Sequence, residues 1–158
     1  MNLRGEKFEK TDIVLTRWMA ANGLSLLRWS IGFVFVWFGL LKYFEGLSPA
    51  RDLAINTISI VTFGLVPDAV IIFGLATLEV LIGIGLIFKI FLRETLLLLF
   101  FQMLGTFLPV FILPSEVFNI FPYSLTLEGQ YIFKNLVVVS SGIVLGATVR
   151  GGRLTAGV

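Results

Sequence analysis

The chain contains neither histidine nor cysteine. Their absence removes the usual protein ligands of zinc, haem and iron–sulfur clusters, and with them every mechanism that depends on a thiol. The sequence also has no Walker loop, no dinucleotide glycine fingerprint and no nucleophile elbow, and its serines have no histidine to act as a base. We therefore expect no metal or haem ligated by His or Cys of this chain, and any catalysis would depend on a bound cofactor or another subunit.

Charged residues are also scarce. Only 14% of the 158 residues are charged, whereas 57% are hydrophobic, and the mean hydropathy is +0.97. A soluble domain could not bury that much apolar surface. The net charge of +2 comes without the clustered basic stripe that a nucleic-acid surface would need. Composition therefore predicts an integral membrane protein whose partner is the lipid bilayer, with no role in nucleic-acid binding.

Four stretches of the sequence are long and apolar enough to cross a bilayer, which takes about 20 residues per helix. These predicted spans cover residues 24–44, 67–88, 95–113 and 130–149. The fold class that follows is an all-α integral membrane protein, a bundle of four transmembrane helices over residues 24–150 with a tail at 151–158.

The segments outside the spans are more polar. Residues 1–23 mix charged and apolar side chains up to Gly23, which predicts a separate amphipathic helix on the membrane surface, stopped by that glycine. Between the first two spans, Ser48 as a cap and Pro49 in the first turn predict a short interfacial helix. Residues 115–129 are expected to form an aqueous or interfacial loop.

Lysines and arginines set the expected orientation, because cytoplasmic loops carry an excess of them. Of the 12 in the chain, Lys42, Arg51 and Lys134 lie on the side of the two longer loops. The others lie in the N-terminal segment, in the turn between the second and third spans and in the tail. We therefore expect both termini in the cytoplasm, and a location in a bacterial inner (plasma) membrane.

Glu79 is the most informative position. It lies twelve residues after Pro67 and ten before Lys89, near the predicted bilayer midplane, where an ionisable group costs at least ~2.5 kcal/mol. One interpretation is a hydrogen-bonded carboxyl group that fixes helix packing, and the other is a proton or ligand site. Lys134 is the expected electrostatic partner, although extension of its side chain towards outer water is an equal alternative.

Other polar residues are expected around the same outer mouth. Lys42, Ser48, Glu128 and Lys134 could form a ring that binds a polar head group. Arg28 opens the first span on the inner side, and anchoring at the interface is the default role for Arg28 and Lys42.

The third and fourth spans carry features that concern packing. Gln102 and Thr106 are one turn apart on one helix face and are expected to make interhelical hydrogen bonds. Gly142-x-x-x-Gly146 is a small-residue pattern that lets helices approach closely.

The run from Leu27 to Lys42 resembles the first helix of the DoxX-like family, and Ser48-Pro49, Glu79 and residues 127–136 fit the same pattern. The resemblance covers residues 24–150. It implies a four-helix membrane fold and, in the best-known branch, the small membrane subunit of thiosulfate:quinone oxidoreductase; other relatives are linked to redox or oxidative-stress complexes. The positions that match are Arg28, Gly39, Lys42, Ser48, Pro49, Glu79, Lys134 and Asn135.

The leading functional hypothesis is a membrane subunit of a quinone-linked oxidoreductase that binds quinone within the bundle and docks a redox partner subunit. Glu79 would relay a proton. The expected ligand-binding residues are Arg28, Lys42, Ser48, Gln102, Glu128, Lys134 and Asn135, with Trp37, Phe38 and Tyr43 as the aromatic lining. Without cysteine, any sulfur chemistry would belong to the partner.

Two alternatives remain open. One is a small-solute or ion transporter or channel that uses Glu79 and Lys134, with a homo-oligomer providing the wider pore. The other is a membrane scaffold without a ligand.

Overall fold

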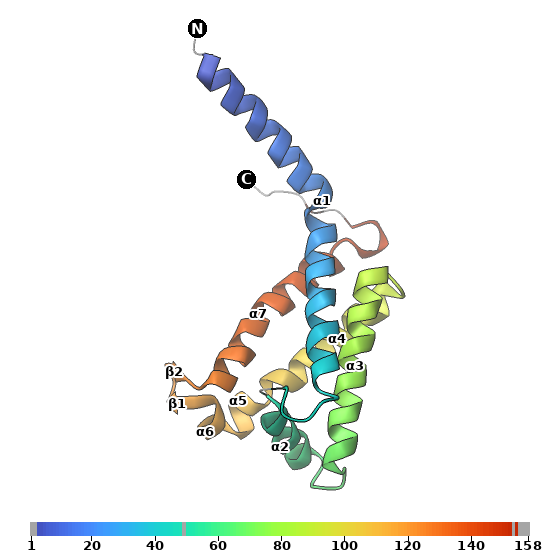
Figure 1. Cartoon of the computed structure of the whole chain (residues 1–158), viewed down its shortest axis with the longest axis vertical. Coiled ribbons are helices and arrows are strands. Elements are labelled where there is room, and N and C mark those ends of the chain that lie inside the picture. The colour runs from blue at the N-terminus through green and yellow to red at the C-terminus, as the bar shows by residue number, and fades with distance from the viewer. Residues whose placement is uncertain (1–2, 49, 153, 155–158) are drawn as a thin grey trace.

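The computed structural model is a largely helical protein with one small hairpin (Figure 1), and it describes residues 3–48, 50–152 and 154. The elements in chain order are α1 Leu3–Leu41, α2 Arg51–Val61, α3 Asp68–Phe88, α4 Leu92–Phe107, α5 Pro109–Ile112, α6 Pro114–Val117, β1 Phe118–Ile120, β2 Ser124–Leu125, α7 Leu127–Gly146 and the 3₁₀ turn η1 Val149–Gly151.

Three helical segments are long and apolar enough to cross a membrane: Glu9–Leu41, Asp68–Phe88 and Leu92–Ile112. They are consistent with the predicted integral membrane class, and they lie close to the first three predicted spans. The interruption expected near Pro109 is present, because α4 ends at Phe107 and α5 begins at Pro109. The helix α7 occupies the position of the fourth predicted span, but it is not among the helices that are long and apolar enough to cross a membrane, and its first half carries Glu128, Gln130, Lys134 and Asn135.

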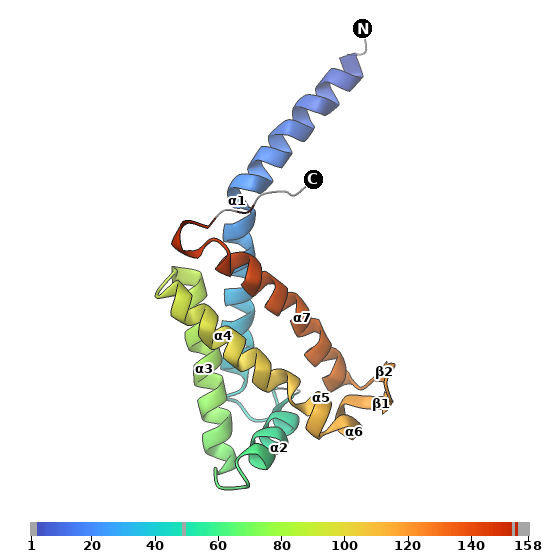
Figure 2. The ribbon, with the colours of Figure 1, turned by 180° about the vertical axis from the view of Figure 1, so that it is seen from behind.

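The expected end of the first helix at Gly23 is wrong. The helix α1 runs through Gly23 over 39 residues without interruption, and its N-terminal part projects from the bundle (Figures 1 and 2). A glycine within a helix costs only about 1 kcal/mol. It ends a helix when it takes a left-handed backbone conformation, and Gly23 is not among the residues with positive φ. The projecting part exposes Trp18 and Met19.

Close packing of α1 on α3 depends on glycines. A Cβ atom at Gly83 would lie 2.6 Å from Val36 Cγ2 and 2.7 Å from the Gly32 carbonyl oxygen. A Cβ atom at Gly39 would lie 2.9 Å from the Cβ of Glu79. Side chains at these glycines would push the two helices apart, so the glycines set how closely Glu79 approaches the end of α1.

The main apolar core lies where α1, α3, α4 and α7 meet. Its buried members are Ile31, Phe35, Ile82, Leu86, Leu96, Leu99, Met103 and Leu145. The small-residue pattern of α7 contributes to this packing, because Gly142 lies against Phe100 and Leu99 of α4, where a Cβ atom would be 3.2 to 3.3 Å away. Gly146 has more space, since its nearest such neighbour is 4.0 Å away.

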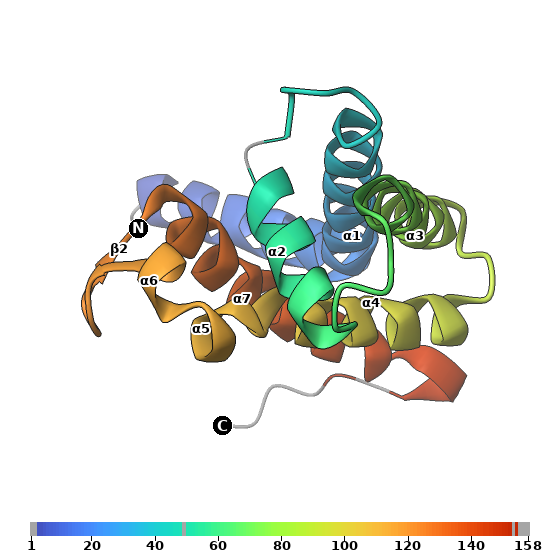
Figure 3. The same ribbon diagram turned by 90° about the horizontal axis from the view of Figure 1, so that it is seen from below.

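The two ends of the bundle differ. The turn between α3 and α4 and the end of α7 lie at the end where α1 projects (Figures 1 and 2). At the other end α2 lies across the bundle, beside α5, α6 and the β1–β2 hairpin (Figure 3). A short helix is thus present at the predicted position, as α2. Its N-cap is Ala50, without a side-chain cap hydrogen bond, rather than Ser48, and Pro49 lies outside the described residues.

The predicted loop at residues 115–129 is more ordered than expected. It contains most of α6, the two-stranded hairpin and the first turn of α7. Thr126 connects these elements, because its hydroxyl donates to the Glu116 carbonyl at 2.7 Å and accepts from the Gly129 amide at 3.0 Å. This N-cap fixes where α7 begins and therefore where Glu128 lies.

Candidate functional site

Glu79 lies at the centre of a hydrogen-bonded cluster that joins three elements. The Lys42 ammonium group, just after the end of α1, lies 2.6 Å from Glu79 Oε2. The Gln102 amide group of α4 donates to Glu79 Oε1, also at 2.6 Å. The side chains of Lys42 and Glu79 are only 10% and 12% exposed. The polar group expected near the bilayer midplane therefore has two partners.

The ion-pair partner of Glu79 is Lys42, so the expectation of Lys134 is wrong. Glu128, Tyr131, Ile132 and Asn135 share one face of α7 at helical spacing and line the same cavity. Lys134 falls on another face, is exposed, and has its ammonium group 5.3 Å from the centre of the Tyr131 ring. This placement agrees with the alternative in which the side chain extends towards the outside.

Two features of the cluster are not explained by packing alone. In the part of the chain that the structure describes, Gln102 Oε1 is a buried acceptor without a hydrogen-bond partner. Within the same described residues, Lys42 uses its ammonium group only towards Glu79, which leaves donor capacity on a group that has three N–H bonds. Unsatisfied buried polar groups cost about 1–3 kcal/mol each. A cluster that existed only to join helices would be expected to satisfy them.

A cavity of about 700 Å³ lies beside the cluster, and most of its wall is apolar. It runs between α1, α2, α3, α4 and the first half of α7, with α2 on one side as a cover. Its polar lining residues are Lys42, Ser48, Thr57, Glu79, Gln102, Thr106, Glu128, Tyr131 and Asn135. The volume falls within the range of small-molecule sites, about 300–1,000 Å³.

The predicted site residues divide into two groups. The structure brings Lys42, Ser48, Glu79, Gln102, Glu128 and Asn135 to this cavity, with Phe38 as an aromatic wall. It does not bring Arg28, Trp37, Tyr43 or Lys134 there. Trp37 is exposed and stacks on Phe33, while Tyr43 bonds to Thr77 through its hydroxyl at 2.8 Å. Their expected role as lining is therefore wrong, because they lie on other faces of the chain around the end of α1.

Arg28 has a structural role at the opposite end of the bundle. It is only 6% exposed, and its guanidinium group donates to the carbonyl oxygens of Leu86 and, at 2.6 Å, Ile87. These carbonyls belong to the last turn of α3, where helix geometry leaves acceptors without partners and a cation is favourable. Arg28 thus caps α3 from α1. Arg28 does not line the cavity beside Glu79, so its expected ligand-binding role there is wrong, whereas its expected role as an interface anchor stays a prediction.

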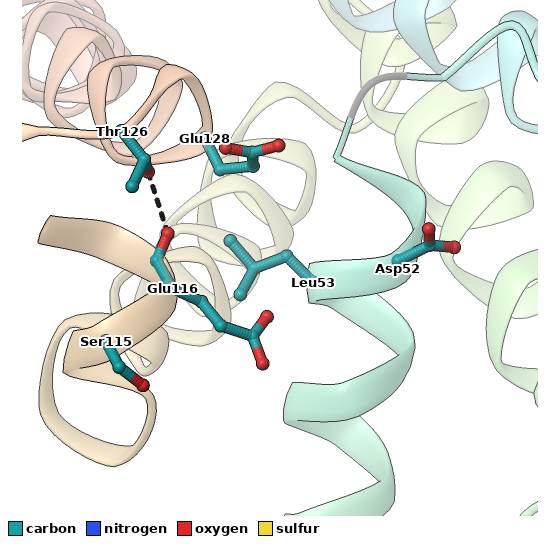
Figure 4. A pocket seen from close by; sticks show the side chains of 6 residues that line it. All are labelled: Asp52, Leu53, Ser115, Glu116, Thr126 and Glu128. Atoms are coloured by element: carbon teal, nitrogen blue, oxygen red, sulfur yellow. Dashed lines mark hydrogen bonds between the residues drawn. The ribbon is translucent and has the colours of Figure 1, made fainter. Parts of the chain in front are cut away.

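A second, smaller cavity of about 250 Å³ adjoins the first (Figure 4). It is lined by Asp52, Leu53, Ser115, Glu116, Thr126 and Glu128. Leu53 and Glu128 line both cavities. Figure 4 shows the side chains of Glu116 and Glu128 on either side of Leu53, while Asp52 points away from them. No group of three or more acidic side chains among the described residues is placed to hold a metal ion.

Comparison with known proteins gives no neighbour: no family model, no curated protein and no solved structure matches the chain. The function is therefore argued from the cavity and the cluster.

Proposed function

We propose that the chain is a four-span membrane protein, with α7 as the fourth span beside the three apolar helices. Two observations support this placement: α7 packs against α4 and α1, and its buried residues lie on the face that covers the common core. The proposal includes a cytoplasmic α3–α4 turn and cytoplasmic termini, and the excess of lysine and arginine in these segments supports that orientation. In the projecting part of α1, exposed Trp18 beside Arg17 suits the membrane–water interface.

We propose further that the bundle binds a quinone and serves as the membrane subunit of a quinone-linked oxidoreductase or oxidative-stress redox complex. The observation that carries this is the cavity of about 700 Å³ with the Lys42–Glu79–Gln102 cluster on its wall. Ligand sites of this kind combine apolar walls with a few placed polar groups. A quinone has a flat head group with two carbonyl oxygens and an apolar tail, which matches both parts of the cavity.

Each residue of the cluster would have a different role in quinone binding. Lys42 keeps N–H donors that its ion pair does not use, and these would bind a head-group oxygen. Gln102 holds Glu79 from the other side, so the carboxylate keeps its position beside Lys42. Glu79 would hold or release a proton at Oε2, next to the ammonium group. Quinones supply reversible two-electron, two-proton redox chemistry, and a partner subunit would supply the electrons.

The test is a binding titration with a short-tailed quinone in lipid nanodiscs. Ala54 of α2 lines the cavity, whereas Ala69 of α3 is exposed and does not. We expect saturable binding to the natural chain, at least about tenfold weaker binding to Ala54→Trp, because the indole occupies the cavity, and natural affinity in the control Ala69→Trp. Absence of saturable binding, or equal binding by the two tryptophan variants, would contradict the proposal.

A small-solute transporter is the second candidate, favoured by one observation. The two cavities adjoin at Leu53 and Glu128, so polar residues continue from the cluster towards the end of the bundle. Solute flux into proteoliposomes that is lost in Glu79→Gln, without quinone binding, would support transport over the redox proposal. Absence of both ligand and flux, with full stability in Glu79→Leu, would support a scaffold.

A further inference from the structure

Glu128 stands where the two cavities meet. It lines the large apolar cavity together with Lys42 and Glu79, and the small cavity together with Asp52 and Glu116. It lies in the first turn of α7, where an acidic side chain interacts favourably with the partial positive charge of the helix N-terminus. Among the described residues it has no hydrogen bond or ion pair that would neutralise it.

Negative charge dominates the joined cavities. Among the described residues, Lys42 is the only cation in the lining of either cavity, and Glu79 at 2.6 Å already pairs with it. Within the described part of the chain, Glu116 and Glu128 then lie on either side of Leu53 without a cation of their own, while Asp52 lines the small cavity but points away from them.

Two cationic side chains that are near Asp52 and Glu128 in the sequence make their contacts outside the cavities. The Arg51 guanidinium group lies 3.6 Å from Glu45, and Lys134 lies over the Tyr131 ring. Neither Arg51 nor Lys134 lines a cavity. Glu116 accepts only a long hydrogen bond of 3.4 Å from the neutral amide of Asn56. The excess of negative charge therefore remains uncompensated by the nearby side chains.

This charge pattern has a consequence for ligand choice. An apolar cavity of about 700 Å³ could hold the chain of many amphipathic molecules, including fatty acids. A carboxylate or phosphate head group would meet Glu128 in surroundings where Lys42 is already neutralised. A neutral head group meets no such repulsion.

We propose that Glu128 is a specificity-determining residue that excludes anionic amphiphiles, so that the cavity takes neutral amphipathic ligands. The inference rests on the proposed quinone site, whose ligand class it narrows. Two like charges about 8 Å apart, at an effective dielectric constant of about 20, change an affinity by roughly 30-fold. Dissolved salt screens part of such an interaction, so we expect a change of about tenfold.

The experiment compares matched ligands in nanodiscs of uncharged lipid at pH 7: laurate, 1-dodecanol with the same chain length, and a short-tailed quinone. In Glu128→Gln we expect the affinity for laurate, taken relative to the affinities for 1-dodecanol and the quinone, to rise about tenfold over the natural chain. The control is Glu94→Gln, which removes a carboxylate from the first turn of α4, outside both cavities. It should leave all three affinities unchanged.

Other results would overturn the inference. Unchanged laurate binding in Glu128→Gln would show that the carboxylate does not select the ligand. An equal change for laurate and 1-dodecanol would assign Glu128 a structural role. If Glu128→Gln does not fold, Glu116→Gln serves as the second variant, because it removes another carboxylate near the same cavity. It must also raise the affinity for laurate. If the quinone does not bind while laurate responds as expected, the proposed function fails and the selectivity stands.

Discussion

Replacement of Lys42 by methionine tests the cluster most sharply, because it keeps the length of the side chain and removes its charge. The Lys42–Glu79 contact of 2.6 Å joins side chains that are about nine-tenths buried. Breaking a buried pair from one side costs about 3–5 kcal/mol, because the remaining charge is left without its partner.

The structure sets a limit to this cost. The orphaned carboxylate can take up a proton, which for an ordinary glutamate at pH 7 costs about 4 kcal/mol. The Gln102 amide still donates to Glu79 at 2.6 Å and supports the charge. We therefore expect Lys42→Met to lower the free energy of unfolding by about 3 kcal/mol, or the melting temperature by about 6–12 °C for a chain of this size.

The pH dependence has a definite sign. At pH 5 the cost of protonating the carboxyl group falls to about 1 kcal/mol, so the deficit of Lys42→Met should shrink as the pH falls from 7 to 5. Reversible unfolding in mixed micelles, followed by circular dichroism, measures it. Lys134→Met is the control, since it removes an exposed lysine from another face of α7, and should change stability by less than about 0.5 kcal/mol.

The double variant Lys42→Met/Glu79→Gln should recover most of the lost stability, because no buried charge remains. A deficit below about 1 kcal/mol, a deficit that does not change with pH, or a double variant as unstable as the single one would each contradict the coupling.

Three further predictions concern the framework around the site, each measured by the same unfolding assay. Gly83→Ala presses a methyl group into the backbone of α1 and should lower the free energy of unfolding by about 1–3 kcal/mol. The control Gly74→Ala in the same helix has no atom within 4 Å of the new Cβ and should be neutral or slightly stabilising. Equal effects of the two variants would contradict the close packing of α1 on α3. Arg28→Met removes the cap on the last turn of α3 and should cost about 1–3 kcal/mol, with the exposed Arg17→Met as its control; a loss in both variants would point to charge alone. Thr126→Val removes the N-cap of α7 and should cost about 1–2 kcal/mol, and faster amide exchange should be confined to the first turn of α7.

The three long apolar helices were predictable because long apolar runs are a strong one-dimensional signal. The second span, expected from Pro67 or Asp68 to Phe88, agrees with α3. The ends of helices were harder to predict, because the residues that mark them are a weaker signal. Gly23 is of a type that often ends a helix, but its backbone conformation stays helical here. The hairpin after α6 was missed, since its two strands are only three and two residues long.

The site was predictable only in part. The sequence identified Glu79 through its depth in the predicted second span, because that depth follows from the span boundaries. The sequence did not identify the partner of Glu79. The choice between Lys42 and Lys134 depends on helix rotation and on the close approach of α1 to α3 at Gly39. Helical periodicity along α7 was the signal that could have excluded Lys134. Residues 128, 131, 132 and 135 share the helix face that lines the cavity, and residue 134 lies on another face.

The central claim is that the cavity beside Glu79 holds a quinone. The most direct measurement is native mass spectrometry with lipid extraction on gently purified natural chain and on Glu79→Gln, with Lys134→Ala as the control outside the cavity. We predict a co-purifying quinone in the natural chain and in Lys134→Ala, and its loss in Glu79→Gln. A natural chain without quinone that also fails to take it up from quinone-containing lipid, or equal amounts in Glu79→Gln, would contradict the claim.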